Sequence, residues 1–471
     1  MTDMNNQTQQ KKINRVMIAA GSSCSGKTMI TCGLLRTLKK RGLDLNAYKC
    51  GPDYIDPMFH STVLEIESEN LDTYLSSDKD IRRIIADSRN DNAVIEGVMG
   101  IYDGMSVDSF KASCYDVASV TDTPIILVID AKNAGRTVIS HIKGILSDDE
   151  KGLIKGIILN RISEGFYEKL RPVLLKELSD MGYGYIRLIG GIPKVNDIAF
   201  ESRYLGLKLP SEIDDIREKI DSFSEILDKR CDIDAVIDIM RSATDIEYQK
   251  EVMSTDINTS SQVPVIAVAY DEAFCFYYRQ NLRLFERAGA RLEFFSPIHD
   301  QQIPKATCGL ILGGGYPELY IESLSKNTSM LKSVKEAIDS GMPTIAECGG
   351  YMYLHSIVRD RQGKPFSLAG ALDGECSYTG HLVRFGYMQV SDTTAKAFNT
   401  EIRGMRGHEF HYYDSTVSCD HLVKKPVSCA EWNAIICDER KLWGYPHFYY
   451  GSCSKMINGF TEAAKDYSNG K

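Results

Sequence analysis

Residues 21–28, GSSCSGKT, fit the pattern G-x-x-x-x-G-K-[ST]. In such a loop, main-chain N–H groups surround a phosphate, the lysine meets the outer phosphates and the hydroxyl binds Mg²⁺. The apolar run RVMIAA precedes the loop and a segment without helix breakers follows it, which is the context that the motif requires. The sequence therefore predicts an ATP site, the structural alternative being a glycine turn that closes a βα unit. The predicted ATP-binding residues are Gly21, Ser25, Gly26, Lys27 and Thr28.

Acidic side chains follow two other apolar runs. Asp53 and Asp56 lie in GPDYIDP after LNAYKC, and Glu96 and Asp103 lie in VIEGVMGIYDG. Ligands bind at the carboxyl ends of the strands in doubly wound sheets, and an acid at a strand end can reach Mg²⁺. Taken alone, the aspartates are equally well explained as turn formers and a lone acid as a helix cap. Together they predict a Mg²⁺ site of Thr28, Asp53 and Glu96.

Two further residues bear on the use of the nucleotide. Asn160, in ILNR, comes at the end of a later apolar run, where it could meet the adenine edge; a structural amide is an equal alternative. Partitioning ATPases related to this fold carry a second lysine early in the loop, whereas the corresponding Ser22 is neutral. The sequence therefore favours an enzyme that phosphorylates its substrate over a mechanical ATPase.

A second candidate site lies in PTIAECGGYMYLHS. Cys348 directly follows an apolar run, and Gly349 and Gly350 open a predicted helix. A thiol on such a turn is expected to be lifted into solvent. There, main-chain N–H groups and the helix dipole stabilise its thiolate form. The amides of Gly313, Gly314 and Gly315, after another apolar run, could form an oxyanion hole or could make only a tight turn.

A cysteine nucleophile needs a base, commonly a histidine that is distant in sequence. We expect His355 to point away, because it lies on the helix that follows the cysteine. His447, in WGYPHFYY, follows an apolar stretch and is the better candidate. His408 and His411, in RGHEFHYYDS, are the runners-up, and His381 is a further candidate.

Two series of short apolar runs alternate with amphipathic stretches and must position these residues. The first, from Arg15 to about Pro193, predicts an α/β fold with a parallel, doubly wound sheet. The second contains PVIAVAY, ARLEFFSP, CGLILGGG and PTIAECGG and predicts another α/β unit. A polar, helical stretch that ends in the linker STDINTSSQVP separates them. The expected parts are a flexible N-terminus (1–14), a P-loop domain (15–206), a helical segment and linker (207–262) and a second domain (263–471).

Composition excludes several classes of protein. The 471 residues exceed what one core usually supports, and the net charge of -9 offers no broad basic surface for nucleic acid. No stretch approaches the roughly 20 apolar residues of a membrane span, and the N-terminus lacks the apolar centre of a secretion signal. We therefore expect a cytoplasmic protein without nucleic-acid or membrane partners. The 13 scattered cysteines indicate neither a disulfide framework nor a zinc site.

Across nearly its whole length the chain resembles the cobyrinate a,c-diamide synthases, glutamine amidotransferases of corrinoid biosynthesis. The resemblance implies a dethiobiotin-synthetase-like P-loop domain followed by a class I glutamine amidotransferase domain. It also implies that glutamine hydrolysed in the second domain supplies ammonia to carboxylates that ATP has activated in the first as acyl phosphates. The motifs that carry it, in family order, are GSSCSGKT, KCGPDYIDP, VIEGVMGIYDG, ILNR, SRYLGL, AVAYDEAFCFYY, FFSPIHD, LILGGGYPE, ECGGYMYL and RGHEFHYY.

Matched to the family, Cys348 is the glutaminase nucleophile and His447 the group that activates it. Tyr54 and Ile55 help decide which carboxylate is presented. The residues near the metal, the nucleotide and the acceptor carboxylate are Asp53, Tyr54, Asp56, Glu96 and Asp103.

The chain departs from the family around the last histidine. The family pattern resembles S-Y-x-H-x-H-F, whereas residues 444–450 read GYPHFYY, without the second histidine and with a proline before the first. Nor does a glutamate stand two residues after His447. The expected catalytic group is therefore a Cys–His dyad.

The resemblance implies ATP, L-glutamine and cobyrinate as partners, with Mg²⁺ as cofactor and a homodimer as one expectation for the assembly. One alternative is the a,c-diamidation of a related tetrapyrrole, nickel sirohydrochlorin or hydrogenobyrinate, because the motifs barely discriminate among macrocycles. Another is a non-enzymatic ATP-binding switch with a decayed glutaminase domain, which only the altered histidine motif supports.

Overall fold

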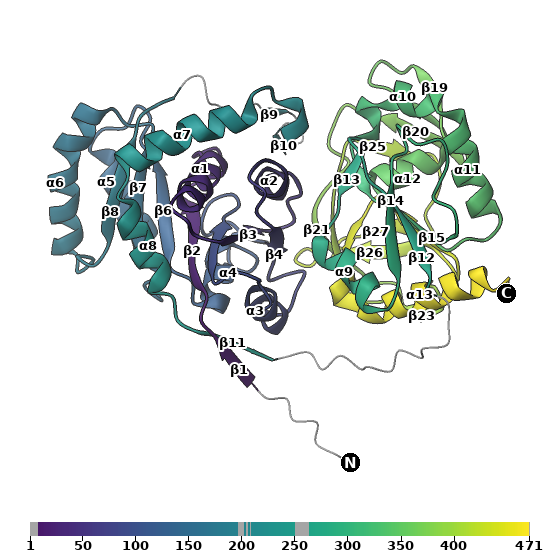
Figure 1. Cartoon of the computed structure of the whole chain (residues 1–471), viewed down its shortest axis with the longest axis horizontal. Coiled ribbons are helices and arrows are strands. Elements are labelled where there is room, and N and C mark those ends of the chain that lie inside the picture. The colour runs from purple at the N-terminus through teal and green to yellow at the C-terminus, as the bar shows by residue number, and fades with distance from the viewer. Residues whose placement is uncertain (1–7, 196–201, 204–205, 208, 250–262, 471) are drawn as a thin grey trace, which may run out of the picture. The chain divides into compact units, whose positions relative to one another are not determined.

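The computed structural model describes residues 8–195, 202–203, 206–207, 209–249 and 263–470. The chain divides into two compact units, Met1–Val252 and Met253–Lys471 (Figure 1). Most of the predicted linker lies outside the described residues, as do residues 1–7 of the predicted flexible N-terminus. None of the described helices is long and apolar enough to cross a membrane.

The first unit is built on a parallel sheet of seven strands in the order β4-β3-β5-β2-β6-β7-β8. Runs such as IILVID form these strands because β-branched side chains suit a sheet that is covered on both faces. The strands are β2 (Asn14–Ala20), β3 (Leu45–Cys50), β4 (Ser68–Leu71), β5 (Asn92–Glu96), β6 (Ile125–Asp130), β7 (Ile154–Asn160) and β8 (Arg187–Ile192). The predicted doubly wound α/β fold is confirmed.

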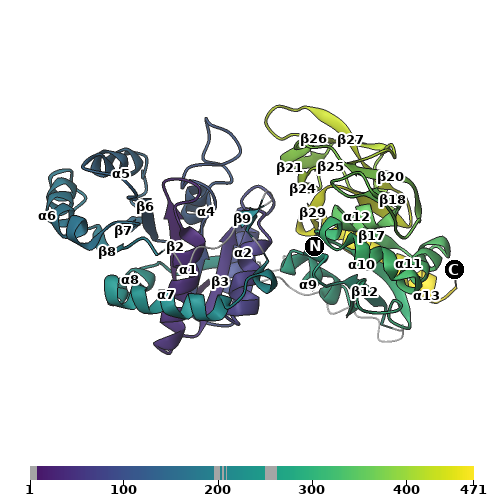
Figure 2. The same cartoon turned by 90° about the horizontal axis from the view of Figure 1, so that it is seen from above.

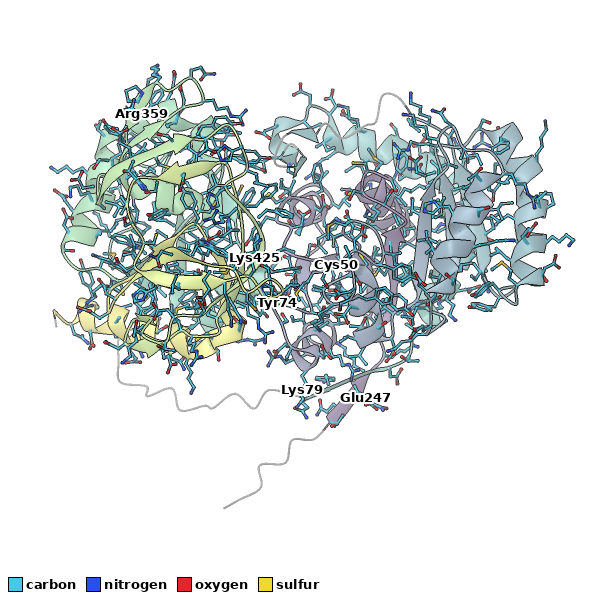
Figure 3. The ribbon with its side chains drawn as sticks, turned by 180° about the vertical axis from the view of Figure 1, so that it is seen from behind. Cys50, Tyr74, Lys79, Glu247, Arg359 and Lys425 are labelled. Atoms are coloured by element: carbon cyan, nitrogen blue, oxygen red, sulfur yellow. The ribbon has the colours of Figure 1, made fainter. Side chains whose placement is uncertain are left out.

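Helices cover both faces of this sheet (Figure 2). One face carries α1 (Lys27–Lys40), α7 (Ile216–Arg230) and α8 (Ile233–Arg241). The other carries α3 (Asp78–Ala86), α4 (Cys114–Thr121), α5 (Thr137–Ser147) and α6 (Glu164–Asp180), whose apolar side chains share one core with the strands. The short helix α2 (Ile55–Met58) and a π-helical turn (Phe59–Val63) follow β3. Cys50, the last residue of β3, lies in the interior, whereas Lys79 is at the surface (Figure 3).

The helical segment that we expected between the domains is part of the first unit. Helix α7 packs so closely on α1 that a Cβ added to Gly33 would lie 2.6 Å from the side chains of Phe223 and Leu227. The strand β11 (Ile246–Gln249) pairs antiparallel with β1 (Thr8–Lys11). Within the segment expected to be flexible, Thr8–Lys11 thus form a strand and Asn14 begins β2. A small ladder joins β9 (Ser202–Arg203) to β10 (Gly206–Leu207).

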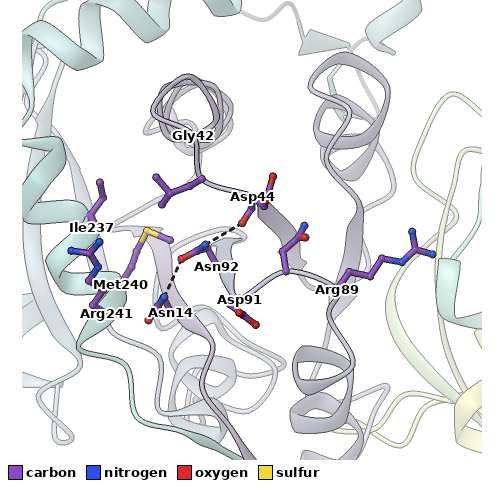
Figure 4. Close-up of a pocket in the computed structure, with 11 residues that line it drawn as sticks. Asn14, Gly42, Asp44, Arg89, Asp91, Asn92, Ile237, Met240 and Arg241 are labelled. Carbon is purple, nitrogen blue, oxygen red and sulfur yellow. Dashed lines mark hydrogen bonds between the residues drawn. The ribbon is translucent and has the colours of Figure 1, made fainter.

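A polar pocket of about 410 Å³ lies at the end of the first sheet where its strands begin, opposite the P-loop (Figure 4). Asn14 and Asn92, which begin β2 and β5, line it and are joined by a 3.1 Å hydrogen bond. Because the strands are parallel, their amino ends lie at the edge away from the P-loop, which follows the carboxyl end of β2. This pocket is therefore not the nucleotide site.

The second unit contains a ten-stranded sheet in the order β14-β12-β15-β17-β28-β27-β26-β21-β24-β29. The first five strands are mutually parallel and the rest pair antiparallel. The strands are β12 (Val265–Ala269), β14 (Arg291–Phe295), β15 (Thr307–Leu312), β17 (Thr344–Glu347), β21 (Arg384–Val390), β24 (Arg406–His411), β26 (His421–Lys424), β27 (Glu431–Cys437), β28 (Lys441–Gly444) and β29 (His447–Tyr449).

Helices also cover this sheet on two sides. Apolar residues of α9 (Arg279–Arg287) and α13 (Ser454–Ser468) enter one core. Those of α10 (Ile321–Lys326), α11 (Thr328–Asp339) and α12 (Gly349–Leu354) enter another. A smaller sheet has the order β19 (Pro365–Ser367), β18 (His355–Arg359), β20 (Leu372–Tyr378), β25 (Tyr413–Ser415). Two further pairs are β13 (Phe274–Phe276) with β16 (Gly314–Gly315) and β22 (Lys396–Ala397) with β23 (Thr400–Glu401).

Candidate functional site

The loop between β2 and α1 has the geometry of an anion site. Gly26 adopts φ 92°, and a Cβ there would lie 2.4 Å from Nδ2 of Asn160, so only glycine fits. The Asn160 amide donates to the carbonyl oxygen of Ser25 at 2.8 Å, and the Ser25 hydroxyl donates to the Ser22 carbonyl at 2.9 Å. No side chain caps the first turn of α1 and no acidic residue lies in it, so its N–H groups are suited to a phosphate. Asn160, which we expected at the adenine edge, braces the loop.

Lys27 is buried beside this loop. Its Nζ donates to the carbonyl oxygens of Ser22 and Met99. Burial, and then the charge of Lys49, lower the pKa of the Lys27 amine. A buried ammonium that is hydrogen-bonded to neutral carbonyl oxygens is strongly stabilised when an anionic phosphate binds beside it.

Three oxygen-bearing side chains meet next to the loop. The Thr28 hydroxyl lies 2.7 Å from Glu96 Oε1 and 3.3 Å from Asp56 Oδ2. Lys49 Nζ bonds the same two carboxylate oxygens, the contact with Glu96 being 3.0 Å. No cluster of three or more His, Cys, Asp or Glu in the described parts of the chain could hold a metal ion. Two carboxylates and a hydroxyl fit Mg²⁺, which usually keeps its other positions for water and phosphate oxygens.

Glu96 is charged although it is fully buried. Its other oxygen, Oε2, lies 2.9 Å from Nε2 of His60, whose Nδ1 lies 3.0 Å from the Ser68 hydroxyl. Burial alone would raise the pKa of Glu96, but Lys49 and His60 outweigh it and hold that pKa well below its usual range. His60 lies in the π-helical turn, a feature that is frequent at functional sites.

The other predicted residues of this region lie elsewhere. Asp53 Oδ1 accepts hydrogen bonds from the main-chain N–H groups of Ile55 and Asp56, so it is a turn former here and Asp56 takes its place beside Thr28. Asp103 is exposed and accepts from the N–H of Gly100 at 2.8 Å. Tyr54, which directly precedes α2, and Ile55, the first residue of α2, are buried.

Cys348 occupies a strained turn between β17 and α12. Its φ of 48° and ψ of -103° are unfavourable for a residue with a side chain, as in other nucleophile elbows. A Cβ on Gly350 would lie 2.0 Å from the carbonyl oxygen of Leu312, and one on Gly349 would lie 3.1 Å from the amide nitrogen of Gly315. Because Gly349 and Gly350 have no side chains, the turn at Cys348 can lie in close contact with the glycine triplet and with the strand before it. The thiol is buried, which corrects our expectation that it is lifted into solvent.

His447 lies against the middle of that triplet. A Cβ on Gly314 would lie 2.2 Å from its Cε1 atom. The register of β24 and β29 sets His408 opposite His447, and the two rings stack with centroids 5.0 Å apart. Nδ1 of His408 bonds the hydroxyl of Tyr278 at 3.1 Å. His447 therefore lies against the glycine triplet that the elbow also approaches, and His408 is its neighbour.

The other candidate histidines have different surroundings. His355 bonds the Tyr351 carbonyl and the Ser415 hydroxyl, in line with its expected orientation. The His411 ring stacks on Tyr445 at 4.0 Å. His381 is exposed.

The glycine triplet does not act as one set of donors. The N–H of Gly313 donates to the Tyr277 hydroxyl at 2.8 Å, and its carbonyl accepts from Gly350. Gly313 is therefore engaged, which corrects its assignment to an oxyanion hole. Gly314 and Gly315 pair with β13 and lie beside His447 and Gly349 respectively.

Electrostatics make the resting thiol and imidazole neutral. Burial, and then the charge of Glu318, raise the pKa of Cys348. Burial, and then His408 and His411, lower the pKa of His447 well below its usual value. A neutral imidazole can accept the thiol proton when substrate binds, which is the requirement for a general base.

Two residues of the P-loop site, Lys49 and His60, were not predicted from the sequence. The signal for Lys49 is a charged residue inside the run LNAYKC, where all six residues of β3 are buried. His60 carries no comparable signal, because a single histidine after a predicted turn is most often structural.

Comparisons with protein families agree with these two sites. Residues 16–204 match the model described as CobQ/CobB/MinD/ParA nucleotide binding domain. Residues 265–433 match the model described as CobB/CobQ-like glutamine amidotransferase domain. The second match includes Cys348 and ends before His447.

Curated relatives match the chain over most of its length. The cobyrinate a,c-diamide synthase of Clostridium tetani is 39% identical over 86% of this chain and 88% of that protein. The enzymes of the same name from Picrophilus torridus and Caldanaerobacter subterraneus subsp. tengcongensis are 36% and 32% identical, over 96% of this chain and 99% and 98% of theirs. The chain therefore belongs to the cobyrinate a,c-diamide synthase family.

Proposed function

We propose that the protein amidates the a and c side-chain carboxylates of cobyrinate, with ATP as the activating substrate and glutamine as the nitrogen donor. The observation that supports this most directly is that one chain carries a P-loop beside two buried carboxylates and a cysteine elbow beside a histidine. A glutamine-dependent ligase needs both sites, because one activates a carboxylate and the other releases ammonia.

In the first unit, an oxygen of the ring carboxylate attacks the γ-phosphorus of ATP and ADP leaves, giving an acyl phosphate. Ammonia then attacks the carbonyl carbon, and the C–O bond to phosphate breaks. Lys27 and the N–H groups at the start of α1 stabilise the charge on the transferring phosphoryl group. Tyr54 and Ile55, at the start of α2, orient the carboxylate.

Thr28, Asp56 and Glu96 would hold Mg²⁺, which neutralises charge on the phosphate oxygens when it is bound. Lys49 keeps the two carboxylates together, since its ammonium contacts both of them. Asp53 shapes the loop through its bonds to the main chain.

In the second unit, His447 takes the proton of the Cys348 thiol as the sulfur attacks the side-chain amide carbon of glutamine. The imidazolium returns that proton to the leaving ammonia, and water hydrolyses the thioester to glutamate and free thiol. Main-chain N–H groups of Gly314, Gly315 and Gly349 are the candidate donors to the oxyanion.

Isotope labelling tests the whole series of reaction steps. The protein is incubated with MgATP, with cobyrinate that carries ¹⁸O in its carboxylates and with glutamine that carries ¹⁵N in its side-chain amide. The masses of the products are then measured by mass spectrometry. We expect two ¹⁵N amides per ring and one ¹⁸O in each inorganic phosphate. Glutamine hydrolysis without transfer of ¹⁵N to the ring would contradict the ligase, and faster amidation of hydrogenobyrinate or nickel sirohydrochlorin would contradict the assigned substrate.

A further inference from the structure

The strand β29, which carries His447, lies at the end of the ten-stranded sheet. Its inner edge pairs with β24 through His447 and its neighbours. The main-chain groups of its outer edge need other partners, because a buried polar group without one costs free energy. In the described structure, two side chains from distant parts of the sequence serve this edge.

Asn281, in the first turn of α9, is one of them. Its Nδ2 donates to the carbonyl oxygen of Phe448, and its Oδ1 accepts from the N–H of Tyr450, both at 2.8 Å. The side chain thus takes the place of a neighbouring strand. Only 5% of Asn281 is exposed, so water does not compete effectively for these bonds.

Glu347, the residue before Cys348, is the other. Its Oε1 accepts from the N–H of Phe448 at 3.3 Å and from the Tyr450 hydroxyl at 2.9 Å. The carboxyl group therefore ties the strand of the nucleophile to the strand of the base. Phe448 is the residue that follows His447, so a shift of its main chain moves the imidazole.

We propose that Asn281 and Glu347 are positioning residues that hold His447 against Gly314 and the Cys348 elbow. In Cys–His–acid triads the acid orients the imidazole directly. Here the outer-edge bonds to residues 448 and 450 orient it through the main chain, which accounts for a dyad that works without a glutamate after the histidine. The proposal rests on the proposed function, in which His447 is the base.

Steady-state glutaminase kinetics on the full-length protein test it. We expect Asn281→Ala to lower kcat about 10- to 100-fold, as misplacement of a catalytic group by about 1 Å does, with KM for glutamine changed less than about threefold. Glu347→Gln keeps the acceptor oxygen and should stay within about threefold of wild type, whereas Glu347→Ala should resemble Asn281→Ala. The matched control is Asn327→Ala, which removes similar amide bonds at the start of α11.

Coupling to His447 separates positioning from a general loss of stability. If Asn281 acts through His447, the His447→Ala/Asn281→Ala double variant should be no slower than His447→Ala alone. Asn281→Asp, which keeps Oδ1 but not the Nδ2 donor, serves if the alanine variant does not fold, and the same lack of additivity is expected.

Three results would overturn the proposal: unchanged kcat in Asn281→Ala, a rise in KM alone, or additive losses in the double variant. Full glutaminase activity in His447→Ala would instead overturn the base assignment of the proposed function.

Discussion

Nε2 of His60 lies 2.9 Å from Oε2 of Glu96, on the side of the carboxylate away from Thr28. Groups of this kind orient metal-binding carboxylates, and their loss typically costs about 10- to 100-fold in metal affinity. We expect His60→Leu to raise by about that factor the Mg²⁺ concentration at which ATP binding is half-maximal. Calorimetric titration of ATP at a series of Mg²⁺ concentrations measures this without turnover.

Two variants control that measurement. His60→Gln can still donate to Glu96 and should lose less, and His299→Leu removes an exposed histidine of the second unit and should change nothing. An unaltered Mg²⁺ dependence in folded His60→Leu would show that His60 does not position Glu96.

Replacement of the elbow thiol should separate the two nitrogen sources. We expect Cys348→Ala to abolish synthesis from glutamine, because no thioester can form, and to retain synthesis from added ammonium. Amide formation is counted by mass with each donor. Synthesis from glutamine in this variant would refute Cys348 as the nucleophile.

The P-loop lysine should affect both nitrogen sources alike. Lys27→Ala removes the ammonium that we propose stabilises the transferring phosphoryl group, so we expect at least about a 100-fold loss of amidation with glutamine or ammonium. Glu96→Gln should have the same consequence. Normal ammonium-dependent turnover in either variant would contradict its role.

The contact between His447 and Gly314 predicts a steric effect. A methyl group at Gly314 would lie 2.2 Å from Cε1 of His447, far inside contact distance, and the imidazole must move. We expect Gly314→Ala to lower glutaminase kcat by about 100-fold while ammonium-dependent synthesis persists. Equal loss with both nitrogen sources would mean that the substitution disturbs more than the imidazole.

The arrangement of the first unit was largely predictable, because it depends on local pattern. Apolar runs marked the parallel strands, and their common edge brings Lys27, Thr28, Asp56 and Glu96 together. Which aspartate turns toward Thr28 was not predictable, since Asp53 and Asp56 are alike in type and differ only in the loop geometry. Asn160 was placed at the correct strand end, but its bond to the loop depends on the close approach of Gly26.

The second unit was predictable only as far as α12. Beyond it the chain is mostly antiparallel strands, whose pairing involves residues distant in sequence, such as His408 with His447. No local pattern reports such a register. For the same reason the contact of Asn281 with residues 448 and 450 could not be inferred from spacing.

The buried carboxyl of Glu347 predicts a pH-dependent stability. Burial raises its pKa from 4.5 to about 8, although the Tyr450 hydroxyl and the Phe448 N–H oppose the rise. Below about pH 4.5 the group is protonated in both the folded and the unfolded chain. Between pH 4.5 and about 8 the unfolded chain has lost the proton and the folded chain keeps it, so the free energy of unfolding falls as pH rises, by at most about 1.4 kcal/mol per unit.

Glutamine at this position does not titrate, and every other group is common to both proteins. The stability of the wild type relative to Glu347→Gln should therefore decrease from pH 5 to pH 8 by a few kcal/mol at most, and level off above it. Urea unfolding of both proteins at pH 5, 6.5 and 8 measures the difference. Parallel pH dependences would show that Glu347 is ionised in the folded protein, where its negative charge would oppose the formation of the neighbouring thiolate.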